Sequence, residues 1–290
     1  MKTNKKAVFF ALLAAVLYAV NSPFSKLLLE KVSETMMASF LYLGAGLGLF
    51  LVGVFRKISG TAEKELPLTK KELPFTVGMV LLDIAAPIFL MVGLNMTTAA
   101  NASLLNNFEI VATTVIALAI FREKVSGRLW LAIVLVTLSS IILSFEDMSS
   151  FSFSFGSIFV LLACVCWGFE NNCTRMLSSK NPLSVVVIKG FGSGLGALVI
   201  ALLLGEKFPE IPYILGALTL GFVAYGLSIY FYIYAQRDLG AAKTSTYYAV
   251  APFVGAGLSM LIFRDVPTVS YTVAFIIMIF GTYFASTDGK

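Results

Sequence analysis

Residues 161–168 read LLACVCWG, and the same pattern occurs at residues 12–19, which read LLAAVLYA. Two more pairs of stretches follow in the same order: GAGLG at 44–48 with GSGLG at 192–196, and FRE at 121–123 with FRD at 263–265. The chain is therefore an internal repeat, with one unit at residues 1–148 and the second at 149–290. Each unit contains five hydrophobic segments, an odd number, so the second unit must enter a membrane from the opposite side.

The composition is that of a membrane protein. Hydrophobic residues make up 58% of the chain and charged residues 13%, which is more apolar surface than a soluble domain of this length can bury. Segments close to the length that crosses a hydrocarbon core of roughly 30 Å lie at about 7–29, 35–55, 74–94, 99–121, 127–145, 156–177, 184–204, 212–235, 241–263 and 268–286. We predict an all-α membrane protein with ten transmembrane helices, built as two inverted five-helix repeats. Inverted repeats are typical of secondary transporters.

The net charge of +5 follows from membrane topology and does not require nucleic acid as a partner. With a cytoplasmic N-terminus, most lysines and arginines fall in cytoplasmic loops, and the outer loops keep only Lys31, Lys207 and Arg264. The positive-inside rule thus predicts a multi-pass protein of the cytoplasmic membrane with both termini in the cytoplasm. The run from Ala7 to Leu29 is longer than the core of a signal peptide, so we interpret it as a retained helix.

Three acidic residues lie within predicted spans and are the best functional evidence in the sequence: Asp83, Glu109 and Glu170. Each costs roughly 2.5–3.5 kcal/mol to insert at a helix centre, so such groups face a cavity or a partner. They suit a ligand for a substrate cation or a carboxylate that carries a proton. The alternative for each is a structural acid that is hydrogen-bonded between helices.

The neighbours of these acids are polar or aromatic. Asn106 and Thr113 are expected to share a helix face with Glu109, while Trp167 and Thr174 lie one turn either side of Glu170. In the repeat alignment Asn21 takes the position of Glu170. Interhelical hydrogen bonding is the competing explanation for such amides and hydroxyls.

Tyrosines gather in the second unit, and Tyr225 and Tyr248 lie deepest in their spans. The repeat alignment places Tyr225 opposite Asp83. Aromatic faces with a carboxylate form a favourable site for an organic cation, whereas an interfacial aromatic belt is the alternative. Lys189 is either a snorkelling residue or a counter-ion for an acid such as Glu170, and the sequence does not decide between them. For Lys26 and Arg175, at the ends of matching spans, snorkelling to the headgroups is favoured.

The two units resemble the EamA-type branch of the drug/metabolite transporter superfamily. The residues that carry this resemblance are Tyr18-Ala19 and Trp167-Gly168 early in each unit, followed by Lys26 and Arg175, and the acids Glu123 and Asp265 that close the fourth span of each. The resemblance implies that four helices of each unit surround a central cavity and that the fifth packs at the periphery. Glu109 departs from it, because many such proteins have proline or a small apolar residue there.

These observations predict a secondary active transporter that moves a small organic solute by alternating access, coupled to protons and biased toward export of organic cations. A zwitterionic substrate such as an amino acid is the alternative, and a channel or lipid-flipping protein is a further one. We expect no enzyme activity, no cofactor and no metal site, since histidine and the common nucleophile and phosphate-binding motifs are absent from the sequence. The expected partners are the substrate, protons and the lipid bilayer; the oligomeric state, including a homodimer, is left open. The candidate substrate or coupling residues are Glu109, Glu170, Asp83, Asn106, Trp167, Tyr225, Tyr248 and Asn21.

Overall fold

The computed structural model describes residues 5–61, 66–121, 126–147, 152–177, 180–239, 244 and 247–286. Helices dominate it, since a helix satisfies the backbone N–H and C=O groups of an apolar segment internally. Their bounds are α1 Lys5–Ala19, α2 Asn21–Leu28, α3 Glu34–Ile58, η1 Lys70–Glu72, α4 Leu73–Met96, α5 Ala99–Leu105, α6 Phe108–Phe121, α7 Gly127–Ser144, α8 Phe155–Leu177, α9 Pro182–Leu203, α10 Ile211–Gly221, η2 Phe222–Leu227, α11 Ser228–Leu239, α13 Ala251–Phe263 and α14 Val269–Ser286. Strands β1 (Phe145–Asp147) and β2 (Ser152–Phe153) pair antiparallel.

The distribution of side chains is that of a protein embedded in lipid. Within the described residues, eight helical stretches are long and apolar enough to cross a membrane, and α13 and α14 are shorter apolar helices. Large apolar side chains such as Phe50, Leu51 and Phe55 on α3 are exposed, whereas Asp83 and Glu170 are buried. Because this is the reverse of a soluble protein, the chain is a multi-pass membrane protein.

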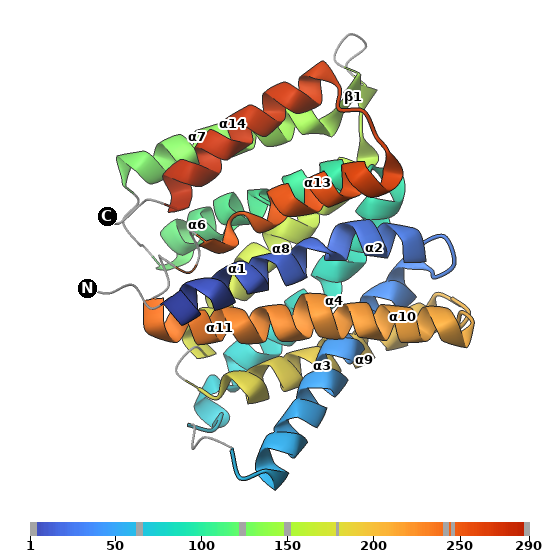
Figure 1. Cartoon of the computed structure of the whole chain (residues 1–290), viewed down its shortest axis with the longest axis vertical. Helices are drawn as coiled ribbons and strands as arrows, with labels where there is room; N and C mark the ends of the chain where they lie inside the picture. Colours follow the sequence, from blue (N-terminus) through green and yellow to red (C-terminus); the bar gives the residue numbers. More distant parts are fainter. Residues whose placement is uncertain are drawn as a thin grey trace.

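One helix pair stands at the edge of the bundle. Figure 1 shows α7 and α14 side by side at the top, and the start of α1 and the end of α14 on the same side of the molecule. The hydroxyl of Ser139 on α7 donates to the carbonyl oxygen of Ala274 on α14 at 2.7 Å. The fifth helix of each unit is therefore peripheral, as the family resemblance implied.

The glycine-rich stretches bring α3 and α9 into close contact. A Cβ added to Gly190 would lie 2.4 Å from the Cα of Gly46, and one added to Gly194 would lie 2.7 Å from the backbone nitrogen of Leu43. Only glycine permits this approach of two helix backbones. The two glycine-rich stretches therefore serve the close packing of α3 on α9.

Several spans that were expected to be continuous are interrupted near their middle. Val20 separates α1 from α2, Asn106 and Asn107 separate α5 from α6, and Ala249 and Val250 precede α13. The eighth span contains the π-helix η2, which includes Tyr225. Interruptions of this kind in membrane helices and π-turns are often found at functional sites, because they place backbone groups and side chains where a regular helix could not.

Two charged side chains bind helix ends at the same end of the bundle, beside the α2–α3 and α9–α10 connections. Lys26 Nζ donates to the carbonyl oxygens of Leu94, Asn95 and Thr97, at 2.6, 2.9 and 3.0 Å, and so satisfies the C-terminus of α4. The expectation that Lys26 extends to lipid headgroups is therefore wrong. Glu206 accepts from the backbone N–H of Met36 at 2.8 Å and binds the first turn of α3 in the same way.

Candidate functional site

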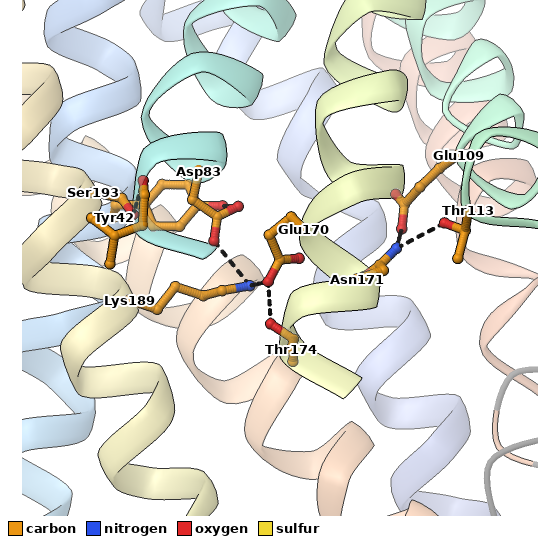
Figure 2. A network of polar contacts seen from close by, with 10 residues as sticks. Tyr42, Asp83, Glu109, Thr113, Glu170, Asn171, Thr174, Lys189 and Ser193 are labelled. Carbon is orange, nitrogen blue, oxygen red and sulfur yellow. Dashed lines mark hydrogen bonds and ion pairs between the residues drawn. The ribbon is translucent and has the colours of Figure 1, made fainter. Parts of the chain in front are cut away.

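Two carboxylates and one lysine meet in the middle of the bundle (Figure 2). Lys189 Nζ lies 3.0 Å from Asp83 Oδ2 and 2.9 Å from Glu170 Oε1. The three residues come from α9, α4 and α8, and their exposed fractions are 7%, 0% and 2%. Of the two explanations left open for Lys189, the structure supports the counter-ion, and it adds Asp83 as a second partner.

Each carboxylate also has a neutral hydrogen-bond donor. Tyr42 on α3 donates its hydroxyl to Asp83 Oδ1 at 2.8 Å. Thr174, one turn beyond Glu170 on α8, donates its hydroxyl to Glu170 Oε1. These contacts fix both carboxyl groups toward Lys189, because a buried charged group requires partners on its remaining lone pairs.

The charges of this cluster do not cancel. Asp83 and Glu170 carry two negative charges when ionised, and Lys189 supplies one positive charge. It is the only lysine or arginine among the buried residues of the part of the chain that the structure describes. The cluster therefore favours one further positive charge, supplied by a proton or by a bound cation.

Glu109 lies on the other side of α8 from Glu170. It occupies the first turn of α6, and its Oε1 accepts a 2.6 Å hydrogen bond from Asn171 Nδ2, which also donates to Thr113 Oγ1 at 3.2 Å. Figure 2 shows Glu170 and Asn171, adjacent in sequence, directed to opposite sides of α8. Unlike Asp83 and Glu170, Glu109 is partly accessible.

A neutral pair, Asn21 and Tyr225, occupies the positions that the repeat equates with Glu170 and Asp83. Asn21 Nδ2 on α2 donates to the hydroxyl of Tyr225 at 3.1 Å, and Ser25 donates to Asn21 Oδ1 at 3.1 Å. The repeat alignment equates Asn21 with Glu170 and Tyr225 with Asp83. The two units thus place an ionic cluster and an uncharged hydrogen bond at corresponding positions.

Tyrosine rings connect these two places. Tyr225 lies 5.1 Å from Tyr42 and 6.1 Å from Tyr18, measured between ring centroids, and Tyr18 lies 5.8 Å from Tyr248. Tyr248 also lies 5.0 Å from Tyr232. The predicted gathering of tyrosines in the second unit is present, and two rings from the first unit, Tyr18 and Tyr42, join it.

Glu109 lies in the same region of the bundle as this tyrosine cluster. Tyr18, Tyr225 and Tyr248 all lie within electrostatic reach of its carboxyl group. Tyr18 and Tyr248, like Glu109, are partly accessible. A partly accessible carboxyl group in the neighbourhood of several aromatic rings is an arrangement that suits an organic cation, since the rings attract positive charge through their faces.

The remaining predicted residues lie nearby but differ in their contacts. Trp167 is buried on α8, the helix that also carries Glu170. Asn106 caps the end of α5, and its carbonyl oxygen accepts a 3.1 Å hydrogen bond from the backbone N–H of Glu109, so a tight turn connects α5 to α6. That the Asn106 side chain shares a face with Glu109 stays a prediction. Cys164 packs against Asn106 and, in the described residues, no group of three or more His, Cys, Asp or Glu side chains is placed to hold a metal ion.

Sequence reasoning missed three members of the site. Tyr18 belongs to the repeated pattern at 12–19, which marks the repeat and does not by itself predict a functional role. Tyr42 lies two residues before the glycine-rich stretch of α3, and Asn171 directly follows Glu170. An intramembrane polar residue beside a predicted acid was the available signal for Asn171.

Taken together, the apolar helices and their polar interior define a helical membrane transporter, and comparisons with known proteins agree. The EamA-like transporter family matches residues 5–145 and 154–287, so the chain belongs to that family, with one matched stretch in each unit. An uncharacterized transporter of Methanothermobacter thermautotrophicus is 26% identical over 96% of this chain and 85% of its own length. One of Clostridium kluyveri is 24% identical over 99% of this chain and 94% of its own.

The fold also occurs among solved structures. One crystal structure superposes with a TM-score of 0.66 at 15% identity, covering 96% of this chain and 95% of that chain. At this level of identity the likeness concerns the fold alone.

Proposed function

We propose that this protein is a proton-coupled carrier of small organic cations that works by alternating access between its two units. The observation that supports it most directly is Glu109, a partly accessible carboxyl group within the membrane bundle and within electrostatic reach of Tyr18, Tyr225 and Tyr248. The rings and the carboxylate together offer an organic cation both aromatic faces and a counter-charge. In this proposal the ten spans form two inverted five-helix repeats with both termini in the cytoplasm.

Coupling follows from competition for one carboxyl group. Burial disfavours an isolated carboxylate, so Glu109 is neutralised either by a proton or by a bound cation. A cation that binds displaces the proton, and a proton that binds displaces the cation. Their movements in opposite directions are then linked, and an inward proton gradient drives export of the cation.

A zwitterionic substrate such as an amino acid is less favoured by the contacts. Its carboxylate would need a cationic partner, and within the described interior Lys189 is already held between Asp83 and Glu170. Binding an anionic group there would require breaking one of these two ion pairs. The transport experiment described next compares an organic cation with an amino acid and so separates the two substrate classes.

The test uses purified protein reconstituted in liposomes that contain a pH-sensitive dye. Tetraethylammonium added outside the liposomes should move protons out of the lumen, toward the side of addition, at a rate that saturates with concentration, and leucine should not. Glu109→Gln should lose the proton movement, whereas Glu30→Gln, an exposed acid in the α2–α3 connection, should retain it. Unchanged coupling in Glu109→Gln would reject the proposed role of Glu109, and a response to leucine alone would favour the zwitterion.

A further inference from the structure

Asp83 and Glu170 hold the ammonium group of Lys189 as a binding site holds a cationic ligand. Two carboxylates from different helices lie 3.0 and 2.9 Å from one nitrogen, and each is oriented by a hydroxyl of its own. We propose that Asp83 and Glu170 form a second cation-binding site, that Lys189 is its tethered occupant in this structure, and that a free primary ammonium ion takes the site when the lysine is removed. This inference deepens the proposed function by adding a site for the same class of ligand.

The Lys189 side chain can leave the two carboxylates without any change in the packing of its helix. The backbone next to Lys189 is fixed, because Gly190 packs directly on the backbone of Gly46 in α3. The side chain of lysine, by contrast, is a flexible four-carbon stem with a compact charge at its end. Exchange of the occupant therefore requires rotation of the Lys189 side chain and no shift of α9.

The repeat shows that the lysine accompanies the acid pair. The positions that match Glu170 and Asp83 are Asn21 in the first unit and Tyr225 in the second, and they bind each other directly at 3.1 Å without a cation. The alignment of the glycine-rich stretches places Leu41 at the position of Lys189, and Leu41 is completely buried. Of these two matching positions, the one beside the two carboxylates is a lysine and the one beside the neutral pair is a leucine. This is expected if the lysine serves as the ligand of the carboxylates.

The lysine leaves the site only when another positive charge arrives. Without Lys189, Asp83 and Glu170 would keep one hydroxyl donor each, which does not compensate two buried negative charges. A proton or a cation must then enter as the lysine departs.

A chemical-rescue experiment tests this site without any transport measurement. Lys189→Ala removes three methylene groups and the ammonium, which together correspond to propylammonium. The purified variant should melt at a lower temperature than the wild type, and propylammonium should raise its melting temperature in a saturable way, because a ligand that binds the folded state stabilises it. The wild type, whose site is filled, should respond much less over the same concentration range.

Controls separate a cation site from general effects. Propan-1-ol, of similar shape but uncharged, should not rescue, and Lys189→Ala combined with Asp83→Asn and Glu170→Gln should not respond to propylammonium. If Lys189→Ala alone does not fold, Lys189→Ala with Asp83→Asn keeps the net charge of the wild-type cluster, and it should still respond through Glu170. No response in either variant, or equal rescue by propanol, would overturn the proposal.

The outcome is independent of the role proposed for Glu109. Lys189→Ala with Glu109→Gln should keep its response to propylammonium even though proton coupling is lost. If propylammonium rescues Lys189→Ala but the wild type does not transport tetraethylammonium, the proposed function is refuted and this site is retained. If the wild type transports tetraethylammonium but propylammonium does not rescue Lys189→Ala, the site is refuted and the proposed function is retained.

Discussion

Asn21 and Tyr225 are joined by a 3.1 Å hydrogen bond at the positions that the internal repeat equates with Glu170 and Asp83. Both residues are almost completely buried, at 1% and 3% exposed. The contact joins α2 of the first unit to η2 of the second, and the ionic cluster likewise joins α4 of the first unit to α8 and α9 of the second. The two units are thus linked twice, once without charge and once with it.

This hydrogen bond predicts that substitutions of Asn21 and Tyr225 are not additive in their effect on stability. Tyr225→Phe should lower the free energy of unfolding by about 1–2 kcal/mol, because it leaves the buried Asn21 amide without its acceptor. Asn21→Leu combined with Tyr225→Phe should cost less than the sum of the two single changes. Unfolding in mixed detergent micelles measures all three, and additive effects would show that the bond contributes nothing.

The amide of Asn171 should control the availability of Glu109. Asn171→Leu removes the 2.6 Å hydrogen bond to Glu109 and keeps a side chain of similar size. Loss of a donor favours the neutral carboxyl, so cation transport should fall and should recover as the external pH is raised. The same substitution at Asn95, which binds Glu34 near the end of α4, is the control and should leave the pH profile unchanged.

Close packing of α3 on α9 predicts a strong effect of one added methyl group. Gly190→Ala places a Cβ 2.4 Å from the Cα of Gly46, so the helices must separate at a cost of about 1–3 kcal/mol or more. Gly257→Ala on α13 meets no atom within 4 Å and should be neutral or slightly stabilising. Equal melting temperatures for the two variants would contradict this packing.

Lys26 should stabilise the end of α4. Lys26→Met keeps the length of the side chain but removes donors to three carbonyl oxygens, and we expect a loss of about 1–3 kcal/mol in unfolding free energy. Lys31→Met, at an exposed lysine of the neighbouring connection, should change stability by less than about 0.5 kcal/mol. A similar small effect of both would mean that Lys26 acts only as a surface charge.

Orientation in the membrane is tested by cysteine labelling. An impermeant thiol reagent should label Lys31→Cys in intact cells, and it should label Thr61→Cys only after permeabilisation, since both residues are exposed at opposite ends of α3. The wild type, with Cys164, Cys166 and Cys173, provides the background. Labelling of Thr61→Cys from outside would reverse the orientation. Ser149, expected in an outer loop, lies outside the described residues.

Much of the architecture could be predicted because it depends on local pattern. Hydrophobic length gave the spans, and the repeated stretches gave two units and the packing role of the glycines. The break at Val20 has a local cause, because Pro23 lacks the N–H that would bond the carbonyl oxygen of Ala19, where α1 ends. The break at Asn106–Asn107 could not be predicted, since no proline or glycine lies near it in the sequence and a continuous helix satisfies the same hydropathy.

The sequence by itself determined that the chain is a repeated helical membrane protein with three acids in its spans. The cost of placing a side chain in lipid depends on the chemistry of that residue, so it can be assigned from the sequence alone. Only the tertiary structure decided what those acids contact. Lys189 lies 19 residues after Glu170 and 106 after Asp83 in the chain, and it bridges both because α9, α4 and α8 meet in space. Partner choice depends on helix rotation and crossing, which are set by packing over the whole bundle and not by the pattern of any one segment.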